Sequence, residues 1–168
     1  NHLLKQRNIK LIKLSKNNTI NISANLKIKP FLVPHREDYS ETVGFKIATS
    51  KKKLIYIPDI DNWEKWDISI TELIKNIDFA LVDGTFFSER EIERDMSLIP
   101  HPLVKNSLKL FSNLKAKERN KIIFTHFNHT NPLIDESSKE HKEVLSKGFR
   151  TAKAVSYTHL RAHETLRY

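Results

Sequence analysis

Apolar and polar residues alternate along the first third of the chain, in the pattern typical of half-buried β-strands. Many of the apolar positions are isoleucine or valine, which strands favour. Residues 16–18, Lys-Asn-Asn, have the composition of a turn between two of the alternating segments. We therefore expect a series of antiparallel strands, at residues 9–14, 19–33, 42–49 and 54–57.

After residue 57 the spacing changes to that of helices separated by short buried strands. Apolar residues between 68 and 77 recur at helical intervals, with Asp67 as the expected cap before them. A second helix is predicted to open at His101 and to run to about Leu114. Short apolar runs predict buried strands at 79–82 and 121–125. Strands followed by strand and helix alternation indicate one layered α/β domain.

Composition narrows the class of protein and the kind of metal site. The 168 residues, 39% of them hydrophobic, are enough for the core of one domain. No run approaches the roughly 18 apolar residues that span a bilayer, and the first residues lack a signal-peptide pattern, so we expect a cytoplasmic protein with no membrane partner. The chain has no cysteine, so any metal must be held by His, Asp or Glu.

The formal net charge of +9 points toward an anionic partner, such as a phosphorylated metabolite or nucleic acid. Clustering of the basic residues would strengthen this inference, yet most lysines alternate with apolar residues, as on the solvent face of strands. Only residues 51–53 form a run of lysines, at a predicted hairpin turn. The spacing therefore favours a small polar or anionic substrate over nucleic acid.

Four polar residues stand where apolar segments end: His35, Asp59, His101 and His126. Each of them alone is more typical of a hydrogen-bonded loop residue or a turn former. Together, three imidazoles and a carboxylate at the ends of strands match the ligand set that suits zinc, with manganese and iron as the alternatives. Such an ion makes bound water acidic enough to act as a nucleophile near neutral pH.

Five segments that contain these residues resemble the coenzyme PQQ synthesis protein B family of metallo-β-lactamase-fold hydrolases. The resemblance extends over residues 9–153 and includes the order and spacing of the segments. They cover residues 33–44, 56–64, 83–87, 99–102 and 125–132.

This resemblance implies an αββα sandwich of the α/β class, with metal held at one edge of its sheets. It implies that His35 completes one metal site, that Asp59 bridges two metals and that His126 completes the second site. By the same resemblance, His101 matches a catalytic histidine that donates a proton or holds a developing oxyanion. Asp61 and His129 are expected to orient the ligands. The alternative is that they form ordinary hydrogen bonds within their loops. The turn at 83–87 is assigned a structural role.

One departure from the family pattern concerns the metal site itself. The defining His-x-His-x-Asp-His segment of the family has no counterpart in this chain. We therefore expect residues 1–153 to form the carboxy-terminal part of the domain, inactive alone and with apolar sheet surface exposed. Residues 154–168 resemble translated sequencing-adapter read-through, and we expect a non-native tail there.

Three functions remain open at this level. The first is a metal-dependent hydrolase or oxygenase-like enzyme, holding one or two ions when intact, with PQQ biosynthesis as the implied pathway. The second is a phosphodiesterase or nuclease of the same fold, favoured by the positive charge and by His101. The third is a carrier that retains the fold and holds a metabolite without converting it, because a fold alone does not fix a reaction.

Overall fold

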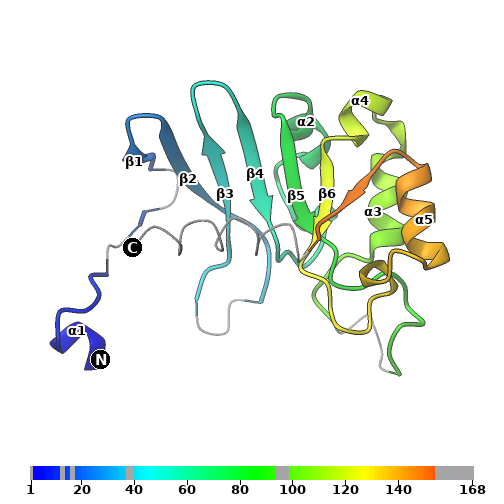
Figure 1. Cartoon of the computed structure of the whole chain (residues 1–168), viewed down its shortest axis with the longest axis horizontal. Helices are drawn as coiled ribbons and strands as arrows, with labels where there is room; N and C mark the ends of the chain where they lie inside the picture. Colours follow the sequence, from blue (N-terminus) through cyan, green and yellow to red (C-terminus); the bar gives the residue numbers. More distant parts are fainter. Residues whose placement is uncertain (1, 12–13, 16–17, 37–39, 94–98, 154–168) are drawn as a thin grey trace, which may run out of the picture.

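The computed structural model describes residues 2–11, 14–15, 18–36, 40–93 and 99–153. The predicted non-native tail, 154–168, lies outside the described residues. Seven strands form one mixed sheet in the order of the sequence (Figure 1). They are β1 (Ile20–Ser23), β2 (Leu26–Leu32), β3 (Val43–Ala48), β4 (Lys53–Ile57), β5 (Phe79–Asp83), β6 (Ile122–Thr125) and β7 (Arg150–Thr151). Pairing is antiparallel from β1 to β4 and parallel from β4 to β7.

Helices α2 to α5 occupy the connections of the parallel half, and Figure 1 shows them beside β5, β6 and β7, whereas α1 precedes β1 and lies apart from them. The α-helices are α1 (His2–Lys5), α2 (Ile70–Lys75), α3 (Val104–Leu110), α4 (Ala116–Arg119) and α5 (Lys139–Ser146). The short 3₁₀ turns are η1 (Trp63–Lys65), η3 (Phe111–Asn113) and η4 (Pro132–Ile134). None of the helices within the described ranges is both long and apolar enough to cross a bilayer.

The predicted α/β class and the strands at 54–57, 79–82 and 121–125 are confirmed by β4, β5 and β6. The strand predicted at 9–14 is wrong for its described residues, which are neither helix nor strand. Alternation alone does not make a strand, because its backbone groups also need a neighbouring strand with which to form hydrogen bonds. The predicted strand at 19–33 is in fact the hairpin of β1 and β2, which turns at Ala24 and Asn25.

Two predicted helix starts are displaced. Ser69, and not Asp67, caps α2, and its hydroxyl accepts a hydrogen bond from the Glu72 amide at 3.4 Å. The second helix begins at Val104, three residues after His101. This displacement leaves the His101 side chain in the loop before the helix. The sequence pattern did not indicate α5 and β7, and β7 adds a parallel strand beside β6.

The core lies between one face of the sheet and the helices. Alternate residues of β4, β5 and β6 point into it and are fully buried, and α2, α3 and α5 contribute to the same cluster. Its central members are Ile55, Ile57, Ala80, Val82, Ile122, Phe124, Ile74, Val104 and Val144. On the opposite face, the neighbouring side chains of Tyr56, Leu81 and Ile123 are only half-buried. The described chain therefore has one sheet and one helical layer, half of the expected sandwich.

Two tryptophans fasten the segment that follows β4. The Trp63 indole donates a hydrogen bond to Ser107 Oγ of α3 at 2.9 Å, and its ring packs against Phe111. Trp66 donates to the carbonyl of Leu32 at 3.1 Å. The loop that carries Asp59 is thus held from both sides, by a helix and by strand β2.

Candidate metal centre

The carboxyl ends of three parallel strands meet at one edge of the sheet and supply most of the candidate site. Strand β4 ends at Ile57, and Pro58, which has no amide hydrogen, precedes Asp59. Strand β5 ends at Asp83, which pairs in register with Thr125, the residue before His126. Because parallel strands point the same way, these side chains reach a common edge.

His35 and Asp59 form the most conspicuous contact of the site. His35 Nε2 lies 2.8 Å from Asp59 Oδ1. Both atoms are buried, yet the angles do not fit a hydrogen bond, and neither atom has another hydrogen-bond partner among the described residues. A backbone hydrogen bond holds the two loops together, because the Asp61 amide donates to the carbonyl of Pro34 at 2.7 Å. Two buried polar atoms thus lie in close contact without forming a hydrogen bond.

His101 lies beside this pair and contacts two carboxylates. Its Nδ1 is 2.8 Å from Asp83 Oδ2 and 3.5 Å from Asp59 Oδ1. Burial disfavours the charged imidazolium, but the hydrogen bond with Asp83 and the charges of Asp83, Asp59 and Asp61 outweigh it. The pKa of His101 is therefore raised above its ordinary value.

Asp83 is fully buried and organises the surrounding groups. Its carboxylate accepts hydrogen bonds from the amide of Ile60 at 3.2 Å, the amide of Thr85 at 2.9 Å and the Thr85 hydroxyl at 2.7 Å. Because that hydroxyl gives its one hydrogen to Asp83, it acts as the acceptor toward His126 Nδ1, 3.0 Å away. This arrangement places the proton of His126 on Nδ1 and leaves Nε2 free to bind a metal.

The structure brings the four predicted residues into one neighbourhood, in two overlapping groups. In each group, one ligand atom per residue lies within 4.8 Å of the others. The first group is His35, Asp59 and His101, and the second is Asp83, His101 and His126. His126 does not join His35 and Asp59 in a single group, and His101 belongs to both groups. The ring centroid of His101 lies 5.7 Å from the ring centroid of His35 and 5.9 Å from that of His126.

The residues expected to orient the ligands lie nearby without contacting them. The Asp61 carboxylate forms an ion pair with Lys65 at 2.7 Å. His129 is exposed and lines the cavity in front of His101. Within the described part of the chain, no hydrogen bond joins either side chain to His35, Asp59 or His126. Their orienting role therefore stays a prediction.

A cavity of about 610 Å³ opens beside His101. The polar groups on its wall include Arg36, Thr85, His101, Asn128 and His129. One side of the cavity is braced by Glu91, whose carboxylate accepts from the Phe87 amide at 2.6 Å and from the Thr130 hydroxyl at 2.7 Å. This brace joins the segment after β5 to the segment that follows His126.

Sequence reasoning assigned the turn at 83–87 to structure and did not foresee that it positions the histidines. A buried aspartate at a strand end, two residues before a threonine, was the available signal for Asp83 and Thr85. For Glu91, which stands among other charged residues, the sequence carries no comparable signal.

The donor set fits a divalent cation. A cation between His35 Nε2 and Asp59 Oδ1 would satisfy two buried atoms that otherwise oppose each other without a hydrogen bond. An imidazole nitrogen and a carboxylate oxygen suit zinc, manganese or iron. The hydrogen bonds of Asp83 to His101, and of Thr85 to His126, are of the kind that orients metal-binding imidazoles.

Comparison with known proteins gives a consistent picture. Residues 1–127 match the family described as Beta-lactamase superfamily domain. The coenzyme PQQ synthesis protein B of Nitrosococcus oceani is 29% identical over 132 residues, which cover 71% of this chain and 41% of that protein. The protein of the same name from Pseudomonas putida is 27% identical over 159 residues, covering 84% and 52%. The chain thus spans about half the length of the curated relatives it matches.

A solved structure shares the fold. The zinc-bound PqqB of Methylobacterium extorquens superposes with a TM-score of 0.67 at 24% sequence identity. The match covers 83% of this chain and 49% of that one. The metallo-β-lactamase fold expected from the sequence motifs is therefore confirmed, for the half of it that this chain contains.

Proposed function

The chain belongs to the beta-lactamase superfamily, and on that basis we propose that it is the carboxy-terminal part of a metal-dependent hydrolase acting in pyrroloquinoline quinone biosynthesis. The pathway is inferred from the names of its relatives. The observation that carries the chemical part of the proposal is the buried contact of His35 with Asp59, beside His101 and His126. Zinc is the ion proposed, because imidazole and carboxylate donors suit it.

Each residue then has a role that follows from its contacts. His35 and Asp59 would hold one ion, His126 would complete a second site next to it, and zinc, when bound, supplies the Lewis acidity that activates water near neutral pH. The His101 Nδ1 is engaged by Asp83, so the opposite nitrogen is the one available to donate a proton to a leaving group. Arg36 and Asn128 on the cavity wall favour a small polar or anionic substrate.

Zinc titration of the chain by calorimetry tests the ligand assignment. We expect weak binding, because few of the ligands of the family site are present and two or three of them give little chelate advantage. His35→Ala and Asp59→Ala should each weaken the residual binding by about tenfold or more, a loss of the size seen when groups at metal sites are removed. His2→Ala removes an exposed histidine of α1 and serves as the matched control. Equal affinities in all four proteins would contradict the assignment.

An extended chain completes this test. Adding the upstream segment of a relative that carries His-x-His-x-Asp-His should raise zinc affinity to stoichiometric binding at one or two equivalents. Tight stoichiometric binding by the present chain, lost on His126→Ala, would show instead that its own ligands suffice. It would also contradict the expectation that the chain alone is inactive.

A phosphodiesterase or nuclease is the second candidate. The position of His101 on the cavity wall near Arg36 favours it, because a proton donor beside a cationic group suits a phosphate ester. Turnover of a generic phosphodiester by the extended, zinc-loaded chain, lost on His101→Ala, would support this alternative. Zinc binding without turnover of any substrate would favour the carrier.

A further inference from the structure

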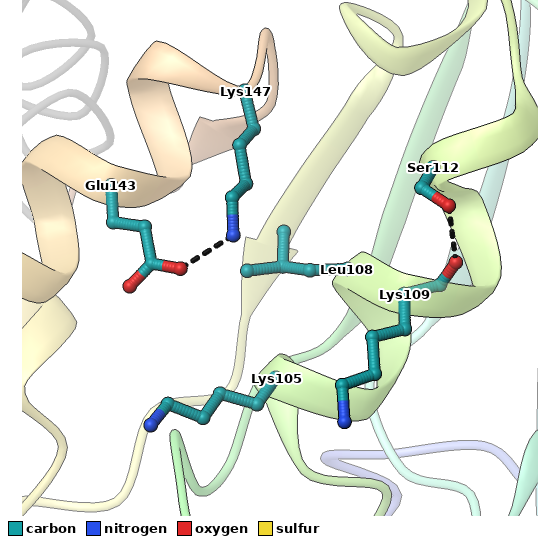
Figure 2. A pocket seen from close by; sticks show the side chains of 6 residues that line it. All are labelled: Lys105, Leu108, Lys109, Ser112, Glu143 and Lys147. Atoms are coloured by element: carbon teal, nitrogen blue, oxygen red, sulfur yellow. Dashed lines mark hydrogen bonds and ion pairs between the residues drawn. The ribbon is translucent and has the colours of Figure 1, made fainter.

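A groove between α3 and α5 lies apart from the candidate metal centre (Figure 2). Its volume is about 480 Å³, and none of its lining residues belongs to the cavity beside His101. The buried side chain of Leu108 forms an apolar floor, and long charged side chains surround it. The residues that line the groove are Lys105, Leu108, Lys109, Ser112, Glu143 and Lys147.

The charges of this groove are not balanced. Lys105 and Lys109 stand one turn apart on α3, where like charges repel each other. Within the part of the chain that the structure describes, neither ammonium forms an ion pair with a carboxylate. Lys105 contacts the Phe87 ring instead, with Nζ 5.6 Å from its centroid. The one carboxylate of the groove, Glu143, is engaged by Lys147. A carboxylate bound between Lys105 and Lys109 would relieve their repulsion.

The groove continues into a second hollow along the same helix. This hollow has a volume of about 390 Å³ and shares Lys105 and Lys109 with the first. Its far wall includes Arg90, while Leu103 adds apolar surface. Two hollows joined at a pair of lysines form an elongated surface with apolar patches, on which four basic side chains outnumber the two carboxylates, Glu89 and Glu143. Such a surface matches an extended segment better than a single small molecule.

We propose that this surface, the lysine groove, binds an acidic extended segment of a partner protein. Carboxylates of the segment would pair with Lys105 and Lys109, and an apolar side chain would lie over Leu108. A peptide fits better than a nucleic-acid backbone, because it can place an apolar side chain over the Leu108 floor, whereas a row of phosphates cannot.

Fluorescence anisotropy with a labelled peptide of glutamates interrupted by leucines tests the proposal on the full 168-residue chain. The double variant Lys105→Glu with Lys109→Glu should weaken binding by about tenfold, because both proposed ion pairs with the peptide are lost. Lys117→Glu with Lys142→Glu changes the net charge equally at exposed positions outside the groove. This control should retain binding within about twofold.

The possible outcomes distinguish peptide binding in the lysine groove from attraction of the peptide by the net charge of the protein. Equal weakening in both double variants would show that net charge alone attracts the peptide and would overturn the proposal. Absence of peptide binding, or tighter binding of single-stranded DNA through the same two lysines, would overturn it as well. Circular dichroism verifies that both variants keep the fold. A glutamine version of the peptide should lose binding if carboxylates are recognised.

Discussion

At the scale of single residues, the buried carboxylate of Asp83 determines how the histidines are oriented. It accepts four hydrogen bonds, from the amides of Ile60 and Thr85, the Thr85 hydroxyl and His101. A charged group without exposure is tolerated only when donors compensate for its lost hydration. The same donors fix the positions of His101 and, through Thr85, of His126. Asp83 thus links stability to the geometry of the site.

Asp83→Asn should lower the free energy of unfolding by about 2–4 kcal/mol. The asparagine side chain replaces one accepting oxygen with an NH2 group, which is a donor and faces the donors around position 83. Urea denaturation followed by tryptophan fluorescence measures the change. Asp67→Asn is the matched control, since Ser69 caps α2 in place of Asp67, and it should stay within about 0.5 kcal/mol of the parent. Comparable losses in the two variants would show that the buried network contributes little.

At the scale of elements, the segment after β4 is fixed to α3 by one buried hydrogen bond. Trp63 of η1 donates to Ser107, whose hydroxyl is fully buried within an otherwise apolar cluster. The contact joins residues 44 positions apart in the sequence. It therefore holds the loop that carries Asp59 against the helix that follows His101, and both sides of the candidate centre depend on it.

A double-mutant cycle with Trp63→Phe and Ser107→Ala should give a coupling of about 1 kcal/mol, the typical net value of a buried hydrogen bond. Unfolding free energies of the parent, the two single variants and the double variant provide it. Ser112→Ala replaces Ser107→Ala in the control cycle, because Ser112 is exposed and its hydroxyl donates to the Lys109 carbonyl of the same helical segment. A coupling no larger than that of the control would contradict the proposed link.

At the scale of the whole molecule, the two faces of the sheet differ in burial. The face toward the helices carries the core, whereas Tyr56, Leu81 and Ile123 on the other face form a row of half-buried apolar neighbours. Soluble monomers rarely expose contiguous apolar patches of several hundred square ångströms. We expect this face to be covered when the rest of a complete domain is present.

The isolated chain should bind the dye ANS at this face, with strong fluorescence enhancement. Leu81→Gln should reduce the enhancement by about half while far-ultraviolet circular dichroism stays unchanged. Leu145→Gln removes an exposed leucine of α5 and should leave the enhancement unaltered. Dye binding that is absent in the parent, or equally reduced in both variants, would contradict an exposed sheet face.

The sequence by itself determined the elements whose evidence is local. The buried strands at 54–57, 79–82 and 121–125 were predicted because short apolar runs bounded by turn residues need no information about distant partners. The placement of Asp59 and His126 beyond strand ends followed from the same runs. The order of five motifs also indicated the fold, since their spacing reflects the path of the chain.

Only the tertiary structure decided which groups meet. It placed His101 between the His35 and His126 sides of the centre, made Asp83 the shared acceptor and fixed the hydrogen bond from Trp63 to Ser107. It also rejected a strand at the described residues of the range 9–14, and added α5 and β7. The reason is physical: a hydrogen bond or a covered apolar face depends on partners distant in sequence, whereas an alternating pattern reports only which side of a segment prefers to be buried.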